Sequence, residues 1–380
     1  MSKFWKMVLA SRMHSRPLGW AHWRSTESRL PKGAVQRERW HLWQIHNQQT
    51  LDHFAEWVAE TAMIAWNSTT KVEMSSEWVD CRPVAWFPST VAPLLTTCEV
   101  GDILVIVETK RMLGRGKSER AILLQAKTSV LPNELDASTC TFPGATSTHK
   151  QRNLYEVNSA PFSIYTSGAK GAAKIGGPYL FPGWPQRSHS HMGDGARYLL
   201  IPNTQALGHG WKSWRTGLPY QTVWPEARTL QGGERIHIAD LILSMAGVSR
   251  PLQGEDIRNG SDWARLTEDL LAYAGTRTVS RFSSTTDTLL TAAKAVSLAK
   301  RLKLTVIGLL TALVPLISRL TEPLRLYAVP PSRKFAADFE SPEHDSGLLV
   351  LRITIRELDN VSELPPQNGT QPTQPTKDTS

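Results

Sequence analysis

Cysteine is scarce in this chain of 380 residues, which contains only Cys81, Cys98 and Cys140. An odd number of cysteines with no C-x-x-C spacing gives no indication of a disulfide framework or a zinc ribbon. A chain of this kind is typical of a reducing compartment, so we expect a cytoplasmic protein.

The sequence also lacks an apolar run long enough to cross a bilayer. Its most apolar segment, Leu304 to Ile317, lies between Lys303 and Arg319 and contains Pro315. A membrane-spanning helix needs about 20 apolar residues, and this segment is shorter. We therefore favour a buried helix over a membrane span and expect no stable membrane insertion.

Acidic residues are rare in the first 45 positions, where Glu27 and Glu38 stand among many Arg, Lys, His and Trp residues. Without a sustained apolar period, residues 1–45 are predicted to form a basic flexible arm. The whole chain has a formal net charge of +9 and a pI near 9.5, which suits a polyanionic partner such as nucleic acid. Nothing in the composition requires an oligomer.

What the chain does contain is a predicted β-hairpin between Glu99 and Lys127. Two short apolar runs, Ile103 to Val107 and Ala121 to Leu124, flank a charged segment centred on Gly114-Arg115-Gly116. Short runs rich in Val, Ile and Leu on either side of a glycine-bearing turn are typical of paired strands. The chain is therefore expected to fold back on itself at this turn.

Three polar residues meet at one end of this hairpin. If the turn centres near Gly114, paired positions sum to about 228, and Asp102 lies beside Ala126, between Gln125 and Lys127. Gln125 and Lys127 are two apart on a strand, so they project to the same face. Asp102 and the Gln125 amide oxygen are suitable Mg²⁺ ligands, and Lys127 can orient a water and offset charge on a phosphate. Alternatively, these are two core strands with polar ends.

An aspartate followed by glutamine-x-lysine resembles the PD-(D/E)XK nuclease superfamily, in the form found in Mrr-like restriction endonucleases. The resemblance covers roughly residues 50 to 130. It implies an α/β, restriction-endonuclease-like fold with a mixed sheet flanked by helices. It also implies phosphodiester hydrolysis that depends on Mg²⁺, with Mn²⁺ as a possible substitute, and a nucleic-acid partner, most simply DNA. Such nucleases usually serve prokaryotic restriction or antiviral defence. A protein that kept the fold but lost the chemistry, and only binds nucleic acid, is the alternative.

In that superfamily the first helix donates a glutamate to the metal site. Leu51 to Trp66 has apolar residues at helical spacing, and Glu56 and Glu60 lie one turn apart on one face of this expected helix. Both are candidates, with Glu60 preferred because it lies closer to the following strand. The alternative is that both are solvated surface charges.

Two further carboxylates lie close to Asp102 in the sequence. Glu108 and Lys110 form an E-x-K element, but six strand residues place Glu108 roughly 20 Å from Asp102, beyond the reach of one metal ion. Glu99 precedes Asp102 by three residues, and at this odd spacing along a strand its side chain is expected to face away.

The predicted domains are a nuclease-like domain over residues 46–205, a mostly helical accessory region over 206–360, and a disordered tail over 361–380 rich in Pro, Gln and Thr. Apolar residues at i, i+3 and i+4 predict helices over 238–246, over 263–273 behind an N-capping Ser261, and over 283–302. Alternation over 347–356 predicts an edge strand.

Overall fold

The computed structural model of the chain describes residues 16–19, 34–66, 68–80, 82–88, 95–111, 116–129, 150–151, 154, 160–180, 195–202, 219–223, 235–249, 251–288 and 347–358. Within them lie helices α3 (Ala34–Ile45), α4 (Gln48–Trp66), α7 (Ile238–Met245) and α8 (Asp262–Arg277). The strands are β1 (Thr70–Asp80), β2 (Val84–Pro88), β3 (Leu95–Glu99), β4 (Ile103–Lys110), β5 (Lys117–Ser129), β6 (Phe162–Tyr165), β7 (Lys174–Tyr179), β8 (Ala196–Pro202), β9 (Gln221–Val223), β10 (Ile236–His237), β11 (Glu255–Asp256), β12 (Thr278–Asp287) and β13 (Gly347–Glu357).

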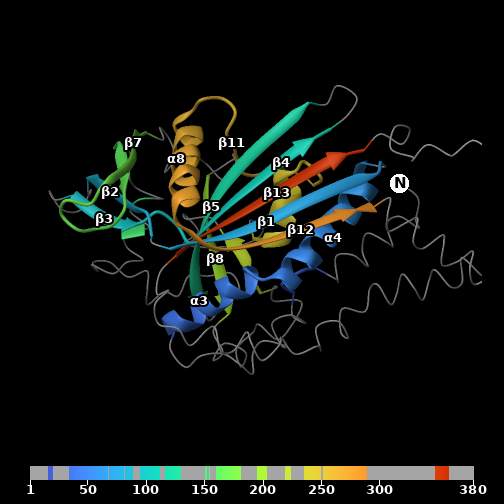
Figure 1. Ribbon diagram of the computed structural model, residues 1–380, viewed down its shortest axis with the longest axis horizontal. Helices are drawn as coiled ribbons and strands as arrows, with labels where there is room; N and C mark the ends of the chain where they lie inside the picture. Colours follow the sequence, from blue (N-terminus) through green and yellow to red (C-terminus); the bar gives the residue numbers. More distant parts are fainter. Residues whose placement is uncertain are drawn as a thin grey trace, which may run out of the picture.

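Most strands belong to one large mixed sheet, so the predicted α/β class is confirmed (Figure 1). Its strands lie in the order β10-β9-β8-β5-β4-β13-β1-β12, and β11 pairs with part of β5. The pairs β4 with β13 and β5 with β8 are parallel, whereas the other pairs are antiparallel. A second sheet, ordered β3-β2-β6-β7, stands beside it.

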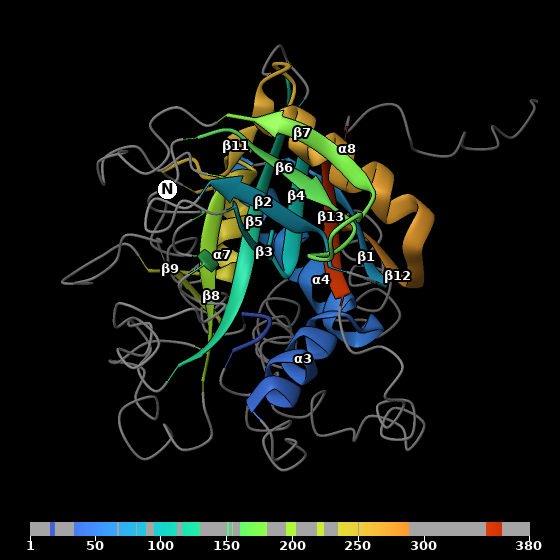
Figure 2. The same cartoon turned by 90° about the vertical axis from the view of Figure 1, so that its left-hand side faces the viewer.

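The central strands of the large sheet are buried on both faces, because their apolar residues alternate between two cores. Ile103 and Val105 of β4 pack in the core that α3, α4 and α7 cover, whereas Leu104 and Ile106 pack in the core beneath α8 and the small sheet. Figure 2 shows the small sheet and α8 on the side of the large sheet away from α3 and α4. Burial on both faces explains why β4 is almost continuously apolar.

The predicted hairpin is formed by β4 and β5. Gly116 has φ +74°, a left-handed conformation that suits glycine, and its carbonyl accepts a hydrogen bond from Arg111 N at 3.3 Å. Ile103 pairs with Leu124, so the numbers of two paired residues add up to 227 rather than to the predicted 228. Asp102 is therefore level with Gln125 and not with Ala126, one residue away from the predicted register.

Several predicted elements are confirmed along the chain. The helix expected after Leu51 is α4, and the later helices are α7 and α8. Ser261 caps α8 as expected, since its hydroxyl accepts a hydrogen bond from Ala264 N at 3.2 Å. The short strand β8 extends the same sheet beside β5.

The prediction of a mostly helical region over 206–360 is not supported. Its described residues include α7 and α8, but also β9, β10, β12 and β13, which join the same large sheet as β4 and β5. The helix predicted from Ser283 begins inside β12, whose Ser and Thr residues pair with β1. Residues on both sides of the boundary expected near 205 thus build one sheet.

The strand predicted over 347–356 is β13, but its expected position at an edge is wrong. It lies in the middle of the sheet, antiparallel to β1 and parallel to β4. The first half of β13 is buried on both faces, whereas Arg352 is exposed farther along. The polar residues of its second half produce the alternation that resembles an edge strand.

The basic arm predicted over residues 1–45 does not extend over α3. Leu42 and Ile45 of α3 pack in the core with Leu18, so this part of the chain belongs to the folded unit. A helix this short depends on tertiary packing more than on its own period, which is why the sequence pattern is weak.

Two predicted features fall outside the described residues, namely the apolar run 304–317 and the tail 361–380. Among the helices that the structure does describe, none is both long and apolar enough to cross a membrane.

Candidate metal and phosphate site

Asp102 stands at the start of β4 and is held by the two strands beside it. Its N–H donates to the Leu124 carbonyl on β5, and its carbonyl accepts from Leu349 N on β13, each at 2.9 Å. The residue is only 4% exposed. The position of this buried carboxyl group is therefore fixed by strands from two distant parts of the chain.

Gln125 lies opposite Asp102 and contacts its carboxylate directly. The amide Nε2 of Gln125 donates to Asp102 Oδ2, and Ala126 N donates to the same oxygen at 2.7 Å. The reversed amide would face one oxygen with another, so this contact assigns Nε2 to Asp102. Gln125 is 1% exposed, and its Oε1 is buried with no hydrogen-bond partner among the described residues. A buried acceptor without a partner is costly, and a bound cation would relieve that cost.

Lys127 follows Gln125 by two residues and completes the predicted trio. Leu124 and Ala126 pack in the core beneath α3 and α4, so the alternation of β5 places Gln125 and Lys127 toward its other face. The positive charge of Lys127 acts on the carboxyl group of Asp102 and lowers its pKa. Burial has the larger effect and raises the pKa of Asp102 to about 6. The structure thus brings Asp102, Gln125 and Lys127 to one end of the hairpin.

A second carboxyl group that interacts with the trio belongs to Glu38 of α3, which was not among the glutamates expected from the sequence. The pKa of Glu38 is raised to about 7, mainly by burial; Lys127 opposes the shift, and the negative charges of Asp102 and Glu99 contribute to it. Helix α3 packs against β5, so Glu38 lies on an element that contacts the strand of Gln125 and Lys127. The signal available in the sequence was that Glu38 is one of only two acids in a basic segment.

Glu99 and Arg82 form an ion pair beside the trio. Their charges act in opposite directions on the pKa of Asp102, which Glu99 raises and Arg82 lowers. The expectation that Glu99 faces away assumed a continuous strand. However, β3 ends at Glu99 and β4 begins at Ile103, so the two-residue period does not apply between them.

The structure does not bring Glu56 or Glu60 of α4 to Asp102. Thr70 Oγ1 donates to the Ala59 carbonyl at 2.8 Å, so Glu60 lies beside the first residue of β1. Thr70 is level with the far end of β4, eight strand residues or roughly 26 Å from Asp102. Neither glutamate is among the charged groups that most affect the pKa of Asp102.

Glu108 also lies far from the trio, as predicted from strand length. It pairs with Lys117 Nζ at 2.9 Å and Lys110 Nζ at 3.2 Å, at the turn end of the hairpin. These ion pairs account for its charge without a metal.

The oxygen atoms near Asp102 fit a hard cation, with a limited set of ligands. Mg²⁺ usually keeps several waters and takes one or two carboxylates from a protein, so the Asp102 carboxylate and Gln125 Oε1 are a suitable donor pair. No group of three His, Cys, Asp or Glu side chains that could hold a metal is found in the described part of the chain. Water and substrate oxygens would therefore complete the coordination.

Comparisons of the chain with protein-family models, curated proteins and solved structures found no match. The functional interpretation therefore rests on the geometry and chemistry of these residues.

The raised pKa of Glu38 leads to a prediction about stability. Its folded-state pKa lies above the usual value of 4.5, so the unfolded state binds fewer protons between these values and stability falls as pH rises through them. We expect Glu38→Gln to remove this loss. The variant should be more stable than the wild type at about pH 8, by up to about 3 kcal/mol, and similar to it at about pH 4.

Urea unfolding at both pH values measures this difference. Glu73→Gln, which changes a half-exposed glutamate on β1, is the matched control. An equal effect of Glu38→Gln at both pH values would contradict the assignment.

Proposed function

We propose that the chain is a Mg²⁺-dependent nuclease of the PD-(D/E)XK type that hydrolyses phosphodiester bonds of DNA, with restriction or antiviral defence as its role. The contact between Asp102 and Gln125 at the end of two buried strands carries this proposal. It leaves Gln125 Oε1 buried without a partner, beside a carboxylate and near a lysine. Carboxylate, amide and lysine are the residue types that the resemblance requires, in the order it requires.

Asp102 and Gln125 Oε1 are the proposed metal ligands, and Mn²⁺ would accept the same oxygen donors. When bound, Mg²⁺ supplies Lewis-acid polarisation of the phosphoryl oxygen and lowers the pKa of a coordinated water. Glu38 takes the place of the helix glutamate in this proposal, because it is the helix carboxyl group whose pKa responds to Asp102 and Lys127.

Lys127 supplies a fixed positive charge on the same strand. In the proposed reaction its ammonium group donates hydrogen bonds to the attacking water or to a phosphate oxygen, and it offsets the negative charge that builds up there. With a pKa of about 7, Glu38 is partly deprotonated at neutral pH and can accept a proton from that water.

DNA is the proposed substrate because the chain carries a formal net charge of +9. A basic surface increases the local concentration of a polyanion and accelerates its encounter with the site.

The second candidate function is nucleic-acid binding by a nuclease fold without activity. Two observations favour it. Both Gln125 Nε2 and Ala126 N already donate to Asp102 Oδ2, and the described residues include no cluster of three metal-binding side chains. In this reading the buried carboxylate serves only to hold the strand ends together.

Metal dependence separates the two functions. We expect the purified protein to nick supercoiled plasmid in Mg²⁺ or Mn²⁺ and to lose this activity in EDTA, with recovery when Mg²⁺ is returned. The measurement is conversion of supercoiled to open-circular plasmid on a gel. A protein that retards the plasmid in every buffer but nicks it in none would support the binding function instead.

A further inference from the structure

Arg82 and Glu99 lie where the chain crosses twice between the two sheets. The first crossing leads from β1 of the large sheet through Arg82 to β2, and the second returns from β3 through Val100 to β4. Pro83 O accepts a hydrogen bond from Val100 N at 2.9 Å, so the two crossings lie side by side. The second crossing ends at Asp102, which places Arg82 beside the proposed metal site.

The charges around Asp102 are close to balance. Asp102, Glu38 and Glu99 are three carboxyl groups, and Lys127 and Arg82 are two cations, which leaves at most one negative charge because Glu38 is partly protonated at neutral pH. A bound divalent cation would reverse this to one positive charge. One phosphodiester anion would then neutralise the site, so its charge suits a phosphate group beside the metal.

Arg82 is the residue best suited to bind that phosphate. A guanidinium group carries five N–H donors in a planar fork that matches phosphate oxygens, and it can contact two anions at once. The Arg82 and Glu99 side chains are 25% and 28% exposed, so solvent reaches their ion pair and a substrate can approach it.

We propose that Arg82 binds a backbone phosphate of the nucleic acid next to the cleaved bond, and that Glu99 is a positioning residue that holds Arg82 until the substrate arrives. This inference rests on the proposed function for the identity of the polyanion. The opposing view is that the ion pair only fastens the two crossings together. The two views predict different changes in DNA affinity when Arg82 or Glu99 is replaced.

Opposite effects of the two partners on DNA affinity are the expected result. Arg82→Gln removes one phosphate contact, which should weaken binding about eightfold at about 0.1 M salt and make the slope of log K against log salt shallower by about one. Glu99→Gln removes an acid that competes with phosphate for Arg82, so it should tighten binding several-fold. If the ion pair only holds the two crossings together, both variants should lower the melting temperature and neither should tighten DNA binding.

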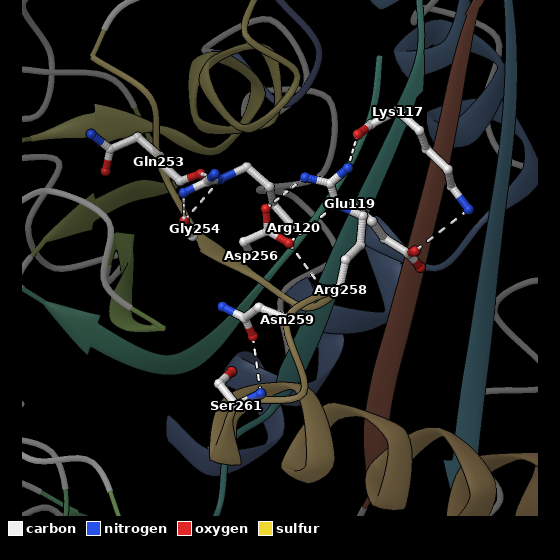
Figure 3. A network of polar contacts seen from close by, with 9 residues as sticks. All are labelled: Lys117, Glu119, Arg120, Gln253, Gly254, Asp256, Arg258, Asn259 and Ser261. Atoms are coloured by element: carbon white, nitrogen blue, oxygen red, sulfur yellow. Dashed lines mark hydrogen bonds and ion pairs between the residues drawn. The ribbon is translucent and has the colours of Figure 1, made fainter.

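The measurement is fluorescence anisotropy of a dye-labelled DNA duplex with a cleavage-resistant phosphorothioate backbone, across a salt series in Mg²⁺, so that the divalent charge is present and no cleavage occurs. A matched control is Arg258→Gln, which breaks another exposed arginine–carboxylate pair. Figure 3 shows Arg258 bound to Asp256, with Nη2 to Oδ2 at 2.8 Å, and to the Lys117 carbonyl. Lys117 is eight strand residues, roughly 26 Å, from Gln125, so this control should leave affinity unchanged.

Weaker binding by Glu99→Gln, or equal weakening by Arg82→Gln and Arg258→Gln, would overturn the proposal. So would a wild type that does not bind the duplex. If Arg82→Gln fails to fold, Arg82→Lys takes its place, because it keeps the charge but loses the planar fork, so only the phosphate-binding role predicts weaker binding.

Because this assay needs no cleavage, it is independent of the nicking assay. Opposite effects in a protein that never nicks plasmid would keep the phosphate site and reject the nuclease. If the protein nicks plasmid but both variants change DNA affinity in the same direction, the nuclease would stand and the phosphate site would be rejected.

Discussion

Lys127→Ala is expected to lower the rate of plasmid nicking by about a hundredfold or more while the protein stays folded. One preorganised electrostatic contact to a reacting group contributes roughly 3 kcal/mol to catalysis, and Lys127 is the cation that the hairpin places on the strand beside Asp102. The rate would be measured with enzyme in excess and saturating Mg²⁺, alongside a thermal melting curve.

Lys117→Ala is the control for this variant. Lys117 lies on the same strand but at the turn end, where it pairs with Glu108 at 2.9 Å. Its loss should leave the nicking rate within about twofold of wild type, since exposed ion pairs contribute little. If a folded Lys127→Ala protein nicks as fast as Lys117→Ala, Lys127 has no part in the reaction.

Asp102→Asn is expected to abolish both Mg²⁺ binding and cleavage. The substitution keeps the size of the side chain but removes the negative charge of the proposed metal ligand, which lies between β5 and β13. DNA binding should persist or become tighter, because it depends on Lys and Arg contacts with phosphates and the change removes an acid from the site. Calorimetric titration with Mg²⁺, filter binding across a salt series and the nicking assay measure the three properties.

The outcome of this variant also decides between the two candidate functions. A wild type that binds DNA with a steep salt dependence but cleaves with neither metal, together with an Asp102→Asn variant that changes neither property, would establish the binding function. Loss of cleavage with intact DNA binding would support the enzyme.

The parts of the site that could be predicted are those in which contacting residues are close in sequence. The short apolar runs of β4 and β5 and the glycines between them predicted the hairpin, and with it the meeting of Asp102 with Gln125. The register differed by one residue because the conformation of a turn, and not only its centre, determines which residues pair.

The remaining parts depend on contacts between distant segments. Glu38 reaches the site from α3, a helix whose own pattern is too weak to distinguish it from a basic arm. The Ser- and Thr-rich sequence of β12 becomes a strand because β1 offers it an edge to pair with. Tertiary contacts of this kind override local propensity and leave little trace in a single sequence.

The central position of β13 has a consequence for the order of events during synthesis. The ribosome adds Leu349 almost 250 residues after Asp102, yet Leu349 N binds the Asp102 carbonyl and β13 fills the space between β1 and β4. Until that strand emerges, a nascent chain has two unpaired strand edges and lacks one of the backbone contacts that hold Asp102. Closing so long a loop is slow. A growing polypeptide would therefore carry Asp102, Gln125 and Lys127 long before the strand that completes the support of Asp102 is in place.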